Sequence, residues 1–552
     1  MTRDLDRFLD RTFDVLVVGG GIHGLAVAYD AAQRGYATAL VERGDFGSGI
    51  SFNHAKTVHG GLRSLQSGDV AKARFSIGER RALASMAPHL VEPLSFMMAT
   101  TRKLTRSAWA LRAGFLLDAT LGVDRNDGVL PRLRLPAGRV VARAEYDRIF
   151  GANARDEATG GAVWNDYHMP ESDRLTLAFA RAAIDHGAVL ANYVKAVEPL
   201  SSGGRISGML VRDQRSGGEF PVAARITVNA AGAHTRPFMQ AFGAAAGYPL
   251  LRAMNVVTSR PAGPMGIGAP TSGGRLLLIM PWHGRMLIGT SHSDEAAQPD
   301  DSAVSTAELQ AFVAEINSAF PALNLSEADV AVVHRGVVPA DANRHGVLGL
   351  MGHHRVHDHA SDGVEGAISV VGVKYTTSRG VGEQVVNLVG RKLDGKARPC
   401  RTGTTRLPGA DFDDVSAERG GAREATREWW PADVADALVS THGTAWAEVA
   451  AIARADSALR DPLPGTLVPA AAIVNAVRHE MAVTLSDVLL RRTSLGSAGY
   501  PGDGIVDACA AVMAAECGWD SARVTQEKAD VRAFYAPVTS QPAILSRREG
   551  RL

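Results

Sequence analysis

Residues 14–24, DVLVVGGGIHG, decide the fold of the first part of this 552-residue chain. The apolar run DVLVV is typical of a buried parallel strand, and glycines with the spacing G-x-G-x-x-G follow it. Gly19 allows a tight turn, Gly21 lets a pyrophosphate approach the backbone, and Gly24 lets the next helix pack close to the strand. The stretch therefore predicts a strand–turn–helix unit that binds a dinucleotide.

The residues that follow complete this unit. LAVAYDAAQR (25–34) predicts a helix that ends at Gly35, and ATALVE (37–42) predicts a second strand that ends in Glu42. A carboxylate at that place can accept hydrogen bonds from ribose hydroxyls, and it repels a 2′-phosphate. The sequence has no second G-x-G-x-x-G between a strand and a helix, so we expect one dinucleotide to be bound.

Composition narrows the class of protein. The length suggests two or three domains, and a formal net charge of +1 argues against nucleic-acid binding. The three cysteines, Cys400, Cys509 and Cys517, have no CxxC spacing, which is typical of a reducing compartment and argues against a cysteine-based metal site. The acidic N-terminus is unlike a signal peptide, and no stretch reaches the ~20 apolar residues of a membrane span. We therefore expect a cytoplasmic protein.

Further motifs, spread along the chain, carry a resemblance. They are KTVHGGLRSLQ (56–66), ERRALASMAPHLVEPLSF (79–96), ITVNAAGAHT (226–235), PWHGRMLIGTSHS (281–293), VVGVKYTTSR (370–379) and TLSDVLLRRTSLG (484–496). In this order they resemble the FAD-dependent glycerol-3-phosphate dehydrogenase family, within the D-amino-acid-oxidase-like flavoproteins. The resemblance extends over almost the whole chain.

The resemblance implies an α/β (α+β) architecture. We expect residues 1–405 to form a Rossmann-like FAD-binding domain interleaved with an antiparallel-sheet substrate domain, and residues 406–552 to form an all-helical C-terminal domain. The FAD-binding parts would be approximately 1–100, 150–240 and 335–400. Alanine- and valine-rich helical stretches after about residue 410 agree with this division.

The resemblance also implies the site. The segment SFNHAKTVHGGLR (51–63) would pass beneath the flavin, with His59 as base and Arg63 as anchor for an anion. Lys374 would add positive charge and is an alternative base, and a helix capped by Thr376 and Thr377 would point at the flavin. The residues predicted to bind the cofactor are Gly19, Gly21, Gly24, Glu42, Arg43, Ser51, Lys56, Gly60, Gly61, Gly232, Gly372, Lys374 and Thr376.

The implied reaction is the oxidation of a polyol phosphate, glycerol-3-phosphate or a relative, by hydride transfer to flavin N5. The implied partners are a small anionic substrate and an electron acceptor, which is a quinone, another carrier or O2. A homodimer and a peripheral contact with the inner face of the membrane are further implications. Two alternatives stay open: oxidation of an amine, amino acid or unphosphorylated hydroxy compound, and a flavin-bearing partner protein whose substrate site has decayed.

Three positions depart from the family pattern. Val338 replaces a phosphate-binding arginine, Ser64 replaces a tyrosine, and Asn255 stands where a lysine–glycine pair is expected. Arg335 lies three residues before Val338, and this odd offset predicts that it lies on the opposite face of a strand. The flavin site looks intact and the substrate end altered. Arg63 then remains as an anion anchor, while His234, His292 and Arg252 are weaker candidates for substrate contact.

Four other features have two interpretations each. The histidines and Asp358 of GHHRVHDHASDG (352–363) favour a solvated hairpin end over a metal site. SAWALRAGFLLDATLG (107–122) favours a helix packed in the core over a helix on a membrane surface. We expect the arginines of DVLLRRT (487–493) to pair with acids between domains. His54 is more often structural at such a place than covalently linked to a flavin.

Overall fold

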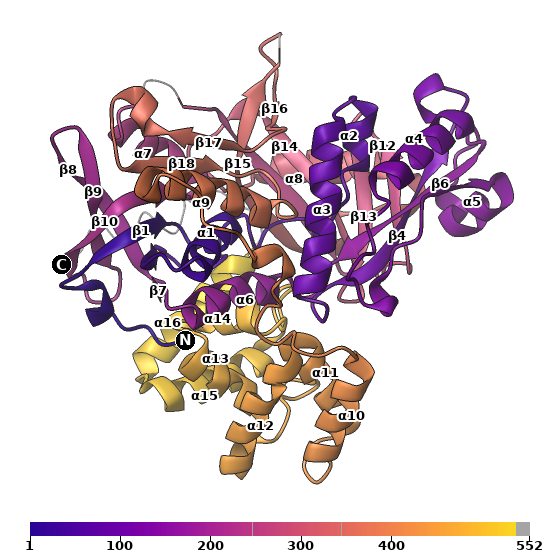
Figure 1. The fold of residues 1–552 in the computed structure, drawn as a ribbon. Helices are drawn as coiled ribbons and strands as arrows, with labels where there is room; N and C mark the ends of the chain where they lie inside the picture. Colours follow the sequence, from indigo (N-terminus) through magenta and orange to yellow (C-terminus); the bar gives the residue numbers. More distant parts are fainter. Residues whose placement is uncertain (245–246, 344, 537–552) are drawn as a thin grey trace.

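The computed structural model describes residues 1–244, 247–343 and 345–536. In these ranges the strands form a parallel sheet with an antiparallel extension and a larger, mainly antiparallel sheet, and the C-terminal part is helical. Figure 1 shows the C-terminal helices at one end of the molecule and α4, α5, β4 and β6 at another. The predicted fold class is confirmed.

The parallel sheet has the order β18-β10-β1-β2-β7. β17 pairs antiparallel with β18 at one edge, and the hairpin β8–β9 extends antiparallel from β10. Three helices share a hydrophobic core with this sheet: α1 (Ile22–Gln33), α6 (Ser172–Asp185) and α9 (Ser378–Asp394). The strands are β1 (Thr12–Val18), β2 (Thr38–Val41), β7 (Val189–Ala191), β8 (Val194–Ser202), β9 (Arg205–Asp213), β10 (Glu219–Asn229), β17 (Arg355–Asp358) and β18 (Ala367–Val371).

Glycine determines how closely α1 approaches β1. A Cβ on Gly24 would lie 1.9 Å from the carbonyl oxygen of Gly19, so only glycine lets the helix start this close to the strand. A Cβ on Gly382 of α9 would lie 2.9 Å from the backbone of Ala26, so α9 also packs directly on α1. The predicted strand–turn–helix unit at residues 14–24 is therefore present.

The larger sheet has the order β16-β15-β11-β14-β13-β12-β4-β6-β3, and β5 pairs with β6. Its pairs are antiparallel except β12–β4. β4 and β6 belong to this sheet, although they lie within the ranges 1–100 and 150–240 that were predicted as FAD-binding parts; that division stays a prediction. The strands are β3 (Thr57–Val58), β4 (Glu92–Thr100), β5 (Arg139–Ala142), β6 (Gly160–His168), β11 (Leu250–Thr258), β12 (Gly266–Pro270), β13 (Leu276–Trp282), β14 (Arg285–Ala296), β15 (Val330–Ala342) and β16 (Leu348–Leu350).

Helices cover the larger sheet and connect it to the rest of the chain. Leu309, Phe312 and Ile316 of α8 pack in one core with Met254 and Val256 of β11. The bounds of these helices are α2 (Leu62–Gln66), α3 (Val70–Met86), α4 (Ala108–Leu121), α5 (Arg143–Phe150) and α8 (Thr306–Ala319), and α7 (Thr235–Ala241) lies against β10 and β18 of the parallel sheet.

The helix α4 does not pack in the core as expected. Only Phe115 and Asp118 of its residues are buried, while the side chains of Trp109 and Leu116 are 62% and 70% exposed. Its pattern of apolar residues is that of a helix with an uncovered apolar side. Within the described ranges, no helix combines the length and hydropathy needed to cross a bilayer.

The C-terminal helices are joined to the parallel sheet by buried ion pairs. Asp45, just after β2, accepts hydrogen bonds from Arg491 and Arg492, and all three side chains are at most 8% exposed. The predicted pairing of the DVLLRRT arginines with acids is confirmed.

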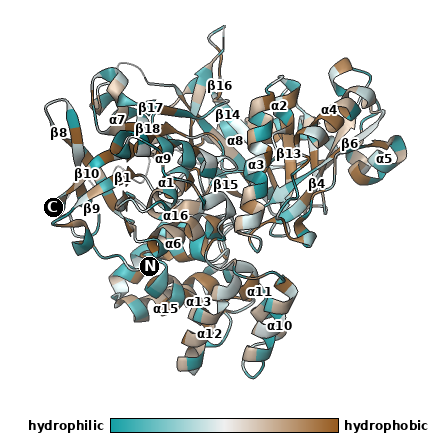
Figure 2. Cartoon of the chain, viewed as in Figure 1, coloured by the Kyte–Doolittle hydropathy of each residue, from teal (hydrophilic) through white to brown (hydrophobic). Residues whose placement is uncertain are grey.

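Figure 2 shows hydrophobic and hydrophilic stretches mixed along the C-terminal helices. They are α10 (Val415–Thr426), α11 (Ala432–His442), α12 (Trp446–Ala455), α13 (Ala470–His479), α14 (Leu485–Asp487), α15 (Asp503–Cys517) and α16 (Ser521–Tyr535), with a π-helical turn at Val488–Arg492.

Candidate active site

A cavity of about 2540 Å³ is bounded by both sheets. From the parallel sheet it takes the ends of β1 and β2 with the turns that follow them, the turn after β10, and residues 372–375 after β18. From the larger sheet it takes parts of β11 and β15 and the loop after β14. The carboxyl ends of neighbouring parallel strands are where this class of sheet binds nucleotides.

The glycine turn and Ser51 form the phosphate end of the cavity. The first turn of α1 begins at Ile22, whose N–H donates to Oγ of Ser51 at 2.9 Å. A Cβ on Gly21 would lie 3.3 Å from that same oxygen, so a larger residue would crowd the turn. A helix N-terminus with a bare glycine backbone and a hydroxyl is a suitable site for a pyrophosphate.

Glu42 is held at the end of β2, as predicted. Its carboxylate accepts hydrogen bonds from the N–H groups of Gly20 at 2.6 Å and Gly44 at 2.8 Å. Burial raises the pKa of Glu42, and these two amides oppose that rise. Each oxygen keeps a lone pair, so the carboxylate fits ribose hydroxyls as donors.

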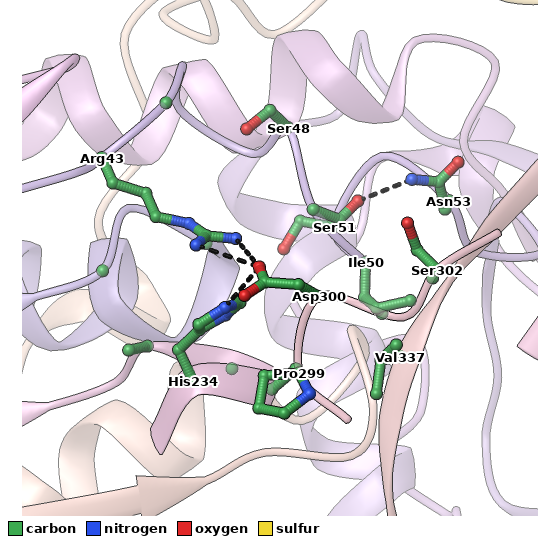
Figure 3. A pocket seen from close by; sticks show the side chains of 18 of the residues that line it. Arg43, Ser48, Ile50, Ser51, Asn53, His234, Pro299, Asp300, Ser302 and Val337 are labelled. Atoms are coloured by element: carbon green, nitrogen blue, oxygen red, sulfur yellow. Dashed lines mark hydrogen bonds and ion pairs between the residues drawn. The ribbon is translucent and has the colours of Figure 1, made fainter. Parts of the chain in front are cut away.

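Asp300 joins the two sheets at the rim of the cavity. It accepts from Arg43, which follows Glu42, at 3.4 Å, and lies 2.8 Å from Nε2 of His234, which follows β10 beyond Gly232. Figure 3 shows the carboxylate between these two side chains. Burial and the charge of Arg43 lower the pKa of His234. Both candidate residues therefore line the cavity, with their polar groups directed at Asp300.

The segment 51–63 lies partly in the cavity. His54 lines it and stacks on Tyr375, with 4.7 Å between ring centroids. Its Nδ1 accepts the N–H of Lys56, and its Nε2 is buried without a partner within the described residues. His23 of the glycine turn also lines the cavity with a buried, unpartnered Nε2.

Lys56 does not reach the cavity. Its ammonium is fully buried and donates to the carbonyl of Phe52 at 2.6 Å and to Ser172 at 3.0 Å, and it pairs with Asp173. These contacts give no support to the prediction that this ammonium contacts the cofactor, which stays a prediction. Its three donors stabilise the loop instead.

Gly60, Gly61 and Arg63 also lie away from the cavity surface. A Cβ on Gly60 would meet the guanidinium of Arg80 at 2.4 Å, and a Cβ on Gly61, whose φ is +75°, would meet Ser76 at 2.9 Å. These glycines are needed for packing against α3, and their predicted role beneath a flat ring stays a prediction. Arg63 is exposed on α2 and does not line the cavity, so its predicted role as anion anchor has no support in this arrangement.

His59 is half-buried behind the cavity wall. Its N–H donates to Oγ1 of Thr376 at 3.1 Å. Burial, reinforced by the charge of Lys374, lowers the pKa of His59 to about 3, so its imidazole is neutral. The segment 51–63 and the segment 372–379 therefore meet at this bond.

The start of α9 is capped differently from the prediction. Neither Thr376 nor Thr377 caps the helix; Glu79 of α3 accepts the N–H of Gly380 at 2.9 Å and pairs with Arg379. Only glycine fits at position 372, because a Cβ there would lie 2.3 Å from the ring of His23. Lys374 lines the cavity, and burial together with Lys72 and Arg63 lowers its pKa to about 8.

Of the three positions that depart from the family pattern, two line the cavity and one is buried in α2. Val338 lines the cavity, and Asn255 is buried there, donating to the carbonyl of Asn53 at 3.2 Å. Ser64 is buried in α2. Arg252 also lines the cavity but pairs with Asp301 and Glu308. His292 lies outside the lining, bonded to the carbonyl of Ser293.

The histidine-rich segment is a hairpin end, as expected. β17 and β18 pair antiparallel on either side of a short helical turn at His359–Asp362. His357 and His359 both bond to Asp362, whereas His353 pairs with Asp69 and His354 with Gln384. The hairpin end is confirmed, whereas the alternative of a metal site stays untested, because the ligand atoms of His357, His359 and Asp362 lie within 4.8 Å of one another.

The residues present fit a bound FAD. The glycine turn leaves room for a pyrophosphate, Glu42 has acceptor capacity for ribose, and the cavity, which His23 and His54 help to line, is large enough for a dinucleotide and a small substrate. His23, Asn53, Asp300 and Arg335 were not predicted as site residues. His23 lies inside the glycine motif, but nothing in the sequence marks the direction of its side chain.

Comparisons with known proteins agree with FAD as the cofactor. A family model described as FAD dependent oxidoreductase matches residues 14–388, and one described as C-terminal domain of alpha-glycerophosphate oxidase matches residues 400–524. A glycerol-3-phosphate dehydrogenase of Synechocystis is 31% identical over 559 residues, covering 96% of each chain. Glycerol-3-phosphate dehydrogenase 1 of Mycobacterium tuberculosis is 33% identical over 497 residues, covering 88% of this chain and 91% of its own.

Solved structures show the same fold. The glycerol-3-phosphate dehydrogenase from Bacillus halodurans, complexed with FAD, superposes with a TM-score of 0.74 at 22% identity over 96% of both chains. The L-alpha-glycerophosphate oxidase from Mycoplasma pneumoniae has a TM-score of 0.52 at 15% identity and covers 72% of this chain and 99% of its own. From the sequence matches, this chain is an FAD-dependent oxidoreductase that belongs to the glycerol-3-phosphate dehydrogenase family.

Proposed function

We propose that this enzyme oxidises the secondary alcohol of glycerol-3-phosphate, or of a closely related polyol phosphate, to the ketone. The observation that carries this proposal is that Lys374, on the wall of the dinucleotide cavity, forms no ion pair within the described residues, although the charge of Asp69 acts on it from farther away. A cation left open beside a cofactor site suits an anionic substrate. The names of the relatives give the substrate, and the cavity agrees with its charge.

FAD, when bound, accepts the two electrons released as the alcohol becomes a ketone. The chain's own residues then have three tasks: to bind the anion, to hold positive charge where negative charge develops, and to take the hydroxyl proton. Lys374 suits the second task as an ammonium. His59 is our candidate for the third because it lies close enough to Lys374 for the two to interact. Like Arg63 it lies outside the lining of the cavity, so Lys374, which lines it, is the alternative base. Arg63 is a weaker candidate for the first task, since it lies outside the cavity surface.

The substrate is tested by anaerobic reduction of the purified holoenzyme. Bleaching of the flavin absorption band is followed after addition of glycerol-3-phosphate, glycerol, other polyols, or a panel of amines and amino acids. We expect glycerol-3-phosphate to bleach the band and the amino acids to leave it unchanged. Bleaching by an amine alone would overturn the proposal, and bleaching by none of them would support a flavoprotein without this activity.

We further propose that the enzyme contacts the inner face of a membrane through α4 and the residues before it. Leu104, Trp109 and Leu116 are exposed there. Arg102, Lys103 and Arg112 are exposed around them, and the acid of this stretch, Asp118, is buried and paired with Arg125. Exposed apolar side chains among cations suit an anionic lipid surface. Such a position would give reduced FAD access to a quinone, although another carrier or O2 is an alternative acceptor.

A further inference from the structure

Arg335 is a half-buried cation in the cavity wall without a counter-charge. Three other arginines that line this cavity have carboxylate partners: Arg43 has Asp300, Arg212 has Glu219, and Arg252 has Asp301 and Glu308. No carboxylate among the described residues pairs with the guanidinium of Arg335. Burial lowers the pKa of Arg335, and no neighbouring acid offsets that effect. A guanidinium stays charged in proteins, so this site holds a positive charge that lacks an anion.

The backbone around Arg335 is fixed at a sheet edge. β11 pairs with β15 without interruption from Val333 to Pro339, while β16 pairs only with residues 340–342. The stretch 335–338 is therefore open on its other side, toward the segment 50–53. There Arg335 donates its N–H to Oδ1 of Asn53 at 3.1 Å, and a Cβ on Gly336 would meet Ile50 at 2.3 Å.

This edge explains why an odd offset does not remove Arg335 from the site. The regular register does set Arg335 and Val338 on opposite faces of β15, opposite Met254 and Leu251 respectively. Because the strand is an edge at this point, the cavity reaches both faces, and both residues line it. Val338 brings no charge, so at this edge only Arg335 carries a cationic group.

We propose that Arg335 binds the phosphate of the substrate and sets the enzyme's preference for a phosphorylated alcohol. The inference rests on the proposed function and deepens it. A planar guanidinium presents parallel N–H donors that match two phosphate oxygens, and such charge-assisted pairs are stronger than neutral hydrogen bonds. Before substrate binds, the guanidinium of Arg335 has no carboxylate partner among the described residues. An arriving phosphate therefore neutralises an unpaired charge and does not have to displace an acid.

The phosphate of the cofactor has the same chemistry, so the test separates the two sources. Arg335→Gln and Arg335→Lys are made in the full chain, and bound FAD is measured from the ratio of flavin to protein absorbance. The KM for glycerol-3-phosphate and the inhibition constant of inorganic phosphate are then measured on holoenzyme. Arg212→Gln is the matched control, because it removes one arginine of the same cavity that already has a carboxylate partner.

We expect Arg335→Gln to retain FAD and to raise both the KM and the phosphate inhibition constant by roughly 10- to 100-fold, the loss of one charge-assisted pair. Arg335→Lys should lie between, and Arg212→Gln should match the wild type. Adding Val338→Arg to Arg335→Gln should recover part of the affinity, because it returns a guanidinium to the same edge. This recovery is a gain, so it cannot be produced by a folding defect.

Three results would overturn the inference. They are an unchanged KM and inhibition constant in Arg335→Gln, an equal loss in Arg212→Gln, or loss of FAD in Arg335→Gln with normal KM in the fraction that keeps it. Failure of the proposed function would look different, since wild-type enzyme would then not be reduced by glycerol-3-phosphate at all. In that case inorganic phosphate is titrated against the flavin spectrum, and a wild-type response that Arg335→Gln lacks supports the anion site, whereas equal responses or none contradict it.

Discussion

The backbone N–H of His59 donates to Oγ1 of Thr376 at 3.1 Å, across 317 residues of sequence. This bond joins the polar segment after the glycine motif to the segment that begins α9. We expect Thr376→Val, which has nearly the same shape, to leave this amide without an acceptor and to reduce the free energy of unfolding by about 1–3 kcal/mol. Urea unfolding followed by flavin fluorescence measures the effect and the accompanying release of FAD.

Thr376→Ser is the control for this bond, because it keeps the hydroxyl and loses only a methyl group. If the valine and serine variants are equally stable and retain FAD equally, the hydrogen bond does not hold the two segments together.

Lys374 predicts the pH dependence of flavin reduction. Its pKa is lowered from 10.5 to about 8 by burial and by the charges of Lys72 and Arg63, so the ammonium is lost as pH rises through about 8. The charged form stabilises negative charge that develops in the site. We therefore expect the anaerobic rate of flavin reduction by substrate to fall through pH 8. His59, with a pKa of about 3, stays neutral from pH 6 to 9.5 and adds no limb there.

Two variants test the assignment of this limb. Lys374→Met should be slow and should lack the limb near pH 8, and Lys374→Arg should move it out of the measured range because arginine stays charged. A wild-type rate that rises through pH 8 would instead make the neutral amine of Lys374 the proton acceptor.

Much of the cofactor site follows from the sequence, and less of the substrate site. The glycine motif and Glu42 were predictable because their roles depend on local spacing within one strand–turn–helix unit. The role of Lys56 was not, because its partners Ser172 and Asp173 lie on another helix, 116 and 117 residues away. Gly60 shows the same limit. A glycine pair signals a close approach, but only the fold shows that the guanidinium of Arg80 is the neighbour on the side where a Cβ would point.

Arg335 shows a related limit. The prediction that Arg335 and Val338 lie on opposite faces of the strand is confirmed by the register. What the alternation cannot show is where a strand becomes an edge, because that depends on where a distant partner such as β16 stops pairing.

Asp45 attaches the C-terminal helices to the parallel sheet through its ion pairs with Arg491 and Arg492. Its carboxylate is fully buried with Arg491 and Arg492, and Asp45→Asn would leave two buried guanidiniums without a counter-charge. Breaking a buried ion pair by removing one partner costs about 3–5 kcal/mol. We expect the variant to lower the thermal unfolding midpoint strongly at pH 7. Asp503→Asn, at an exposed ion pair with Arg532, is the control and should leave the midpoint nearly unchanged.

The same residue has a predictable effect in acid. Burial opposes ionisation of Asp45, but the charges of Arg492 and Arg491 outweigh it and lower its pKa in the folded state below the ordinary 3.8. This stabilisation is complete above the unfolded pKa of about 4 and is lost as pH falls through the folded pKa. The wild type and Asp45→Asn should therefore differ most above pH 4 and converge below it. A difference that is constant from pH 7 to pH 3 would show that the charge of Asp45 is not the cause.

The exposed side of α4 predicts binding to anionic membranes. Trp109 is 62% and Leu116 70% exposed beside Arg112. Burying either side chain among lipids is worth about 1.5–3 kcal/mol, so Trp109→Ser with Leu116→Ser should lower cosedimentation with phosphatidylglycerol vesicles at least tenfold. Phosphatidylcholine vesicles should bind less wild-type enzyme, because they offer no negative charge to the surrounding cations. Leu467→Ser, an exposed leucine of the C-terminal helical region, is the matched control. Equal losses in the control and in the α4 variant would mean that general surface hydropathy, and not this helix, determines binding.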